Sequence, residues 1–160
     1  MLMTITYFMK TLKYLGLLLL FVLTIMGCKN GQDPERTATL EKAGKIHDEG
    51  LALGAEVKDM IVTIDEILAD LGDYKEAVSY SERTKAIKAD YKTWQETLVE
   101  VPGHAHHHHE GEHHHHDHSM DNAPAEEILK KQEDSRDFIT DIHSRASRIT
   151  KGLQNLVESF

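Results

Sequence analysis

The chain has 160 residues, a formal net charge of −9 and a single cysteine, Cys28. This length allows at most one ordinary domain, and one cysteine excludes both an intramolecular disulfide framework and a zinc site built from cysteines alone. The 18 basic residues are outnumbered by 27 acidic ones, and aromatic residues make up only 6% of the chain. Because nucleic-acid binding needs a basic face that neutralises phosphates, this balance argues against a nucleic-acid partner.

Residues 1–27 are predicted to be a secretory signal. They carry two lysines, no acidic residue and an apolar run over 15–23, which is about half the length of a membrane-spanning helix. Ile25-Met26-Gly27-Cys28 follows and resembles the lipobox of bacterial lipoproteins. The resemblance implies cleavage after Gly27 and lipidation of Cys28, with the acyl chains holding the protein on a membrane. The alternative is an uncleaved signal anchor with an incidental cysteine.

The segment after Cys28 bears on the expected location. Residues 28–36 are polar and are expected to form a lipidated tether. Lys29 stands where some bacterial lipoproteins carry an aspartate that retains them in the inner membrane, so the outer membrane is favoured within the cell envelope. Loss of two lysines with the signal changes the net charge from −9 to −11. Such a chain avoids anionic headgroups, so the lipid must supply the membrane contact, with the chain in the periplasm or at the surface.

Three long helices are predicted after the tether. Apolar residues recur at alternating three- and four-residue spacing on both sides of Gly72, a glycine stop that Asp73-Tyr-Lys-Glu76 follows as a capping box. The third helix is expected to begin near Asn122 and Pro124, a cap residue and an early proline. We therefore expect an all-α fold, an elongated up-down-up three-helix bundle with coiled-coil-like stripes. Its parts are a helical hairpin over 37–101 and a C-terminal helix over 123–160.

Several residues on the helical stripes are expected to serve packing. Gly50 and Gly54 lie on the first stripe, where a missing side chain allows a neighbouring helix to come close. Neither His47 nor His143 has a histidine, cysteine or carboxylate three or four residues away, so both are interpreted as structural and not as metal ligands. An aromatic group is expected in the bundle core: Tyr80, Tyr91 and Trp94.

The segment over 102–122 carries the most distinctive composition. It is of low complexity, has no apolar periodicity and is expected to be a disordered loop. Imidazole is a common ligand of Zn²⁺, Cu²⁺ and Ni²⁺, and the carboxylates of Glu110, Glu112 and Asp117 can complete a ligand shell. We expect zinc first, with copper or nickel as alternatives. Ten histidines are the candidate metal ligands: His104, His106, His107, His108, His109, His113, His114, His115, His116 and His118.

Two other interpretations of this loop stay open. It can be an inert spacer between the helices. It can also respond to pH, because ten imidazoles titrating near ~6.5 would offset most of the negative charge. The chain has no glycine-rich phosphate loop and no nucleophile elbow, and we expect no enzymatic activity.

The mature chain also resembles a group of small helical bacterial lipoproteins, some labelled viral A-type inclusion protein. The resemblance rests on Ile46-His-Asp-Glu49, on Tyr91-Lys-Thr-Trp94 and on Ala125-Glu-Glu-Ile-Leu-Lys-Lys-Gln132. It implies a helical lipoprotein fold.

These features together predict a membrane-anchored lipoprotein that binds divalent transition metal for buffering, delivery or tolerance. In an up-down-up bundle the tether and the histidine-rich loop share one end, close to the membrane. The expected partners are the membrane, metal ions and an envelope transporter or helical protein. The alternative is a non-catalytic interaction protein of the cell envelope, with the loop as spacer or pH-responsive element.

Overall fold

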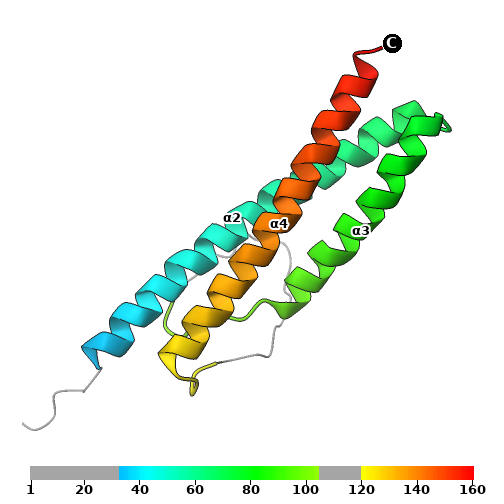
Figure 1. Cartoon of the computed structure of the whole chain (residues 1–160). Coiled ribbons are helices and arrows are strands. Elements are labelled where there is room, and N and C mark those ends of the chain that lie inside the picture. The colour runs from blue at the N-terminus through cyan, green and yellow to red at the C-terminus, as the bar shows by residue number, and fades with distance from the viewer. Residues whose placement is uncertain (1–32, 105–119) are drawn as a thin grey trace, which may run out of the picture. The chain divides into compact units, whose positions relative to one another are not determined.

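A computed structural model describes residues 33–104 and 120–160 of the chain. Within these ranges the chain forms three helices and no strand: α2 (Pro34–Leu71), α3 (Lys75–Thr97) and α4 (Ala125–Val157) (Figure 1). The prediction of an all-α fold is therefore confirmed. The predicted signal, the lipidated tether up to position 32 and most of the predicted loop lie outside the described residues.

The three helices pack together within the compact unit Glu35–Phe160. Lys42 pairs with Glu133 at 3.0 Å, and Glu56 pairs with His143 at 2.8 Å, so α2 and α4 run in the same direction. The short turn after α2 sends α3 back along it (Figure 1). The up-down-up order of the bundle is confirmed.

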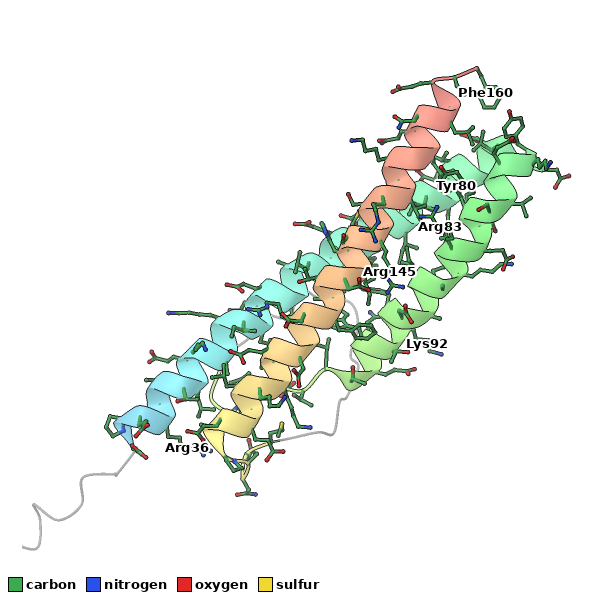
Figure 2. All side chains as sticks on the ribbon, viewed as in Figure 1. Arg36, Tyr80, Arg83, Lys92, Arg145 and Phe160 are labelled. Atoms are coloured by element: carbon green, nitrogen blue, oxygen red, sulfur yellow. The ribbon has the colours of Figure 1, made fainter. Side chains whose placement is uncertain are left out.

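Contacts between α3 and α4 fix their antiparallel register. The Trp94 indole donates a hydrogen bond to the Ser135 hydroxyl at 3.0 Å. Ten residues further along α4, the Arg145 guanidinium lies 2.7 Å from the Asp90 carboxylate of α3 and 2.8 Å from Asp141 on its own helix (Figure 2). Because Arg145 is only 29% exposed, this carboxylate pair neutralises a cation that is largely withdrawn from water.

The turn between α2 and α3 depends on glycine. Gly72 has φ +54°, a left-handed conformation that glycine adopts without steric cost, and its amide donates to the Leu68 carbonyl at 3.1 Å. The glycine stop is confirmed. The capping box is wrong, because Tyr74 is the N-cap of α3, one residue later than expected, and no side chain caps this helix.

Pro102 explains why α3 ends at Thr97 and not near Val101. In a helix, its ring would clash with the carbonyl of Leu98, four residues earlier, and it has no N–H to bond that carbonyl. The chain accordingly leaves the helix at Leu98, which has ψ 134°. The extended segment after it brings the Val101 side chain into the interior, where it is 2% exposed.

The start of α4 also differs from the expectation. Pro124 is the N-cap, and its carbonyl accepts the amides of Glu127 and Ile128 at 3.1 and 3.2 Å. The predicted cap at Asn122 is wrong, because the N-cap lies two residues beyond it and no side chain caps the helix.

Two apolar clusters hold the bundle together. The larger one is dominated by α4, whose residues in this cluster recur every three or four positions, as the helical period requires. Full burial of one aliphatic side chain of this kind contributes about 1.5–3 kcal/mol. The larger cluster consists of Val57, Ile64, Ile87, Trp94, Ile139, Ile142, Ala146, Ile149 and Leu153. The smaller one consists of Ala43, Val101 and Ile128.

The predicted aromatic core and glycine contacts are confirmed in part. Trp94 is 3% exposed, and Tyr80 and Tyr91 are half-buried against the larger cluster. A Cβ added at Gly54 would overlap the Trp94 ring, so the close approach predicted there is confirmed. The same prediction is wrong for Gly50, where an added Cβ meets nothing within 4 Å.

This difference between two glycines on one helix is testable. Gly54→Ala should destabilise the chain by about 1–3 kcal/mol, because the methyl group overpacks the core against Trp94. Gly50→Ala should stabilise it by up to about 1 kcal/mol through helix propensity. Urea unfolding followed by circular dichroism measures both. Equal effects of the two substitutions would contradict this account of the packing.

Candidate functional site

The two stems of the histidine-rich loop lie at one end of the bundle. We call this region the loop end and define it as residues 36–50, 98–104 and 120–132. Met120 packs against the smaller apolar cluster. The Arg36 guanidinium, at the start of α2, donates a hydrogen bond to the Ala123 carbonyl at 3.1 Å (Figure 2). The start of α2, the segment after α3 and the start of α4 thus meet here, as the up-down-up order predicts.

His104 is the only one of the ten candidate ligands that the structure describes. It ends a turn in which its amide donates to the Val101 carbonyl at 3.1 Å and Gly103 has φ +76°. Its imidazole Nε2 lies 3.0 Å from both carboxylate oxygens of Asp48 on α2. The ring also faces Gly44, one turn earlier on the same helix. The His104 side chain is 27% exposed and that of Asp48 is 56% exposed, so the contact lies at the surface of the bundle.

A chain of two hydrogen bonds, one buried and one part-buried, lies beside His104. The Gln132 amide nitrogen donates to the Val99 carbonyl at 2.8 Å, and its Oε1 lies 3.0 Å from Nδ1 of His47. A carbonyl can only accept, so the Val99 contact sets the orientation of the amide and leaves Oε1 as an acceptor. Nδ1 of His47 must therefore carry the proton. In neutral His47 the lone pair lies on Nε2.

The surroundings of His47 favour its neutral form. The side chain is 6% exposed. Burial lowers the pKa of His47, and the nearby His104 lowers it further, although the bond to Gln132 and the charges of Asp48 and Glu100 act in the opposite direction. His47 therefore joins α2 to α4 as an uncharged imidazole near neutral pH.

His143, the other histidine outside the loop, lies on the surface of the bundle. Its Nε2 is 2.8 Å from a carboxylate oxygen of Glu56, and the side chain is 30% exposed. Like His47, it links α4 to α2. Both histidines thus have the packing contacts that a structural interpretation requires.

The structure describes only one of the ten proposed metal ligands, His104. Over residues 33–104 and 120–160, no group of three or more His, Cys, Asp or Glu side chains is placed to hold a metal ion. The other nine candidate histidines, the three acidic residues between them and Cys28 lie outside the described residues. The metal-ligand set and the lipid attachment therefore stay predictions.

Two contacts at the loop end escaped the sequence analysis. Nothing in the sequence pairs Asp48 with His104, which is 56 residues away. The only available signal was that Gly44 and Asp48, four residues apart, share one face of a helix. Gln132 had a clearer signal, because a polar residue stands there among apolar positions of α4 and is 2% exposed.

One motif within the loop was also overlooked. His109-Glu110-Gly111-Glu112-His113 has the H-E-x-x-H spacing that metalloproteases use when a helix presents both histidines on one face. In a segment of this composition, many metal-ligand spacings arise from histidine density alone. The motif lies outside the described residues. Its two histidines are already among the candidate metal ligands, so it does not change the predicted chemistry.

The described helices contain no stretch that is long and apolar enough to cross a membrane. Comparison with protein-family models, with curated proteins and with solved structures found no match. The resemblance to small helical bacterial lipoproteins stays a prediction.

The buried His47 predicts a specific pH dependence. Unfolded His47 titrates near ~6.5, and its folded pKa is lower. Between these two values the unfolded state binds more protons, so the free energy of unfolding falls as pH drops through ~6.5 and stops falling below the folded pKa. His47→Gln keeps a donor for Gln132 and does not titrate, so this variant should lose less stability in acid.

Urea unfolding at a series of pH values, followed by fluorescence of Trp94, measures the effect. Trp94 is the only tryptophan of the chain. His143→Gln is the matched control, because it removes a surface imidazole and leaves His47 in place. This variant should lose as much unfolding free energy in acid as the parent chain does. An identical pH dependence in the parent chain and in His47→Gln would show that His47 carries no part of it.

Proposed function

We propose that this chain is a membrane-anchored lipoprotein that binds divalent transition metal through its histidine-rich loop. The observation that carries the proposal is the density of donors: ten histidines and three acidic residues occur between His104 and His118. Imidazole and carboxylate together suit Zn²⁺, Cu²⁺ and Ni²⁺. Zinc is the expected ion, and the expected role of the binding is metal buffering, delivery or tolerance.

The chemistry of the loop predicts its binding properties. Tetrahedral zinc takes four ligands, so ten histidines can fill two sites. Many combinations of these histidines are equivalent, and the loop loses conformational entropy when it binds an ion. The affinity should therefore be weaker than the roughly 10–16 kcal/mol of a structural zinc finger. Selectivity should follow the general order of the metals, with the tightest binding for copper.

The folded bundle supports the loop by holding both of its stems. On one side, Val101 is buried and His104 contacts α2; on the other, Met120 packs against the same apolar cluster. Closing a loop on fixed ends removes part of the entropy that a free chain would lose on binding. The bundle thus serves as a clamp for the metal-binding segment.

Chain connectivity ties the proposed lipid to the loop end. Five residues separate Cys28 from Pro34, where α2 begins. A fully extended chain rises at most about 3.5 Å per residue, so the distance from Cys28 to Pro34 is limited to roughly 20 Å. A lipid on Cys28 would then keep the loop near the membrane surface, where it can exchange metal with an envelope transporter, our proposed partner.

A second candidate function is that of a non-catalytic helical interaction protein. Apolar side chains are exposed at the opposite end of the bundle, where the Tyr74 and Phe160 rings meet edge to face at 4.8 Å (Figure 2). Val78 and Val157, in the adjacent helix ends, are 56% and 46% exposed. In this case the loop would act as a spacer or as a pH-responsive element.

Isothermal titration of the full chain in a mild detergent tests metal binding. Zn²⁺ should bind with a stoichiometry of about two ions per chain. A variant with serine in place of the nine histidines from His106 to His118 should lose this binding, because nine of the ten imidazoles are gone while the length of the loop is kept.

His143→Gln is the control, and it should bind zinc as the parent chain does. Equal zinc binding by the parent and the loop variant would exclude the loop as the site. Absence of binding by the parent for zinc, copper and nickel alike would reject metal binding and favour the interaction protein.

Mass spectrometry of the chain purified from bacterial membranes tests the lipid anchor. The mature chain should begin at Cys28 and carry the added mass of a diacylglyceryl group on its sulfur and a fatty acyl chain on its amine. Cys28→Ser should remain uncleaved and free of lipid. An unmodified cysteine in a chain that retains residues 1–27 would contradict the lipoprotein assignment.

A further inference from the structure

We propose that His104 anchors the start of the histidine-rich loop to α2, with Asp48 as the positioning residue, and stays outside the metal-ligand set. The first half of this inference depends only on described residues. The second half rests on the proposed metal binding, and it narrows the candidate ligands from ten histidines to nine.

The contact with Asp48 engages one nitrogen of the His104 ring. Both carboxylate oxygens lie 3.0 Å from Nε2, which is the distance of a direct hydrogen bond. A carboxylate accepts hydrogen bonds, so Nε2 must carry a proton. A protonated ring nitrogen has no lone pair for a metal ion. Coordination through Nε2 would therefore require the loss of the contact with Asp48.

Gly44 covers the other nitrogen. A Cβ placed on this glycine would lie 2.5 Å from Nδ1 of His104 and 2.8 Å from its Cε1, so the ring lies directly over the α2 backbone. Gly44 is buried beneath it, within the helix. Glycine is required here for the approach of the ring, and not for any special backbone conformation. In this position, Nδ1 faces the helix surface and is shielded from an incoming ion.

The backbone of the loop stem supports the same arrangement. Val101 is buried between Ala43 of α2 and Ile128 of α4. After Pro102, the left-handed Gly103 turns the chain so that the His104 side chain meets α2. The stem thus contacts the bundle at two residues, Val101 through apolar packing and His104 through its polar contact with Asp48. The chain is therefore held on the bundle as far as His104, and the proposed metal-binding segment begins after this residue.

Nuclear magnetic resonance of the histidine-labelled full chain in a mild detergent tests the inference. His104→Gln assigns the His104 signals. Without metal, His104 should show the tautomer with the proton on Nε2, and Asp48→Asn should shift its signals. When Zn²⁺ is added, the His104 signals should keep their positions, while those of the loop histidines shift or broaden.

Gly44→Ala offers a second test, with Gly50→Ala as the matched control. The added methyl group at position 44 should displace the His104 ring, raise hydrogen exchange of the 104 amide about tenfold and make the His104 signals sensitive to zinc. At position 50 an added Cβ meets nothing within 4 Å, so the His104 signals should be unchanged. Both substitutions add one methyl group to a buried glycine of α2.

The outcomes separate this inference from the proposed function. Zinc-dependent shifts of His104 together with the loop histidines, in the parent chain, would overturn the exclusion of His104 while supporting metal binding. If zinc shifts no histidine signal, the proposed function fails. The comparison of the parent chain with Asp48→Asn, both without metal, still shows whether Asp48 positions His104. Unchanged His104 signals in Asp48→Asn would overturn the anchor itself.

Discussion

A single buried amide, that of Gln132, connects the three parts of the chain that meet at the loop end. It lies on α4, donates to the Val99 carbonyl and accepts from His47 on α2. Loss of this amide would remove the partner of the buried Nδ1–H of His47, at a cost of about 1–3 kcal/mol, and would also release the part-buried Val99 carbonyl. The path of the chain from α3 to the histidine-rich loop depends on this bond.

The rest of the loop end builds on that constraint. Once Val99 is held on α4, Val101 reaches the apolar cluster, and Pro102 and Gly103 bring His104 onto Asp48. A segment rich in histidine has no apolar side chains with which to pack. The bundle holds the described residues at both ends of this segment, and in the proposed function its imidazoles bind the metal ion.

The helices could be predicted because their stripes are long and regular. Apolar residues at three- and four-residue spacing identify all three, and Gly72 marks the turn. Helix ends were less predictable, since Pro102 acts on a carbonyl four residues earlier and the N-caps at Tyr74 and Pro124 use no side chain. Gly50 and Gly54 have the same spacing on the stripe, and only tertiary structure shows that one meets Trp94 and the other does not.

The candidate site, like the fold, could be predicted from the sequence only in part. Composition alone identifies the histidine-rich loop, because such a density of imidazole needs no fold to be recognised. The contacts that fix its stem could not be predicted, because Asp48 and Gln132 are distant in sequence from His104 and Val99. Burial of His47 could be expected from its place on the stripe. Its partner and its tautomer depend on the packing of α4 against α2.

X-ray absorption at the zinc edge shows whether imidazoles of the loop bind the metal ion, as we propose. The full chain loaded with zinc should show nitrogen neighbours at about 2.0–2.1 Å, with the outer-shell scattering of several imidazole rings. A first shell of oxygen alone, without imidazole scattering, would contradict the claim.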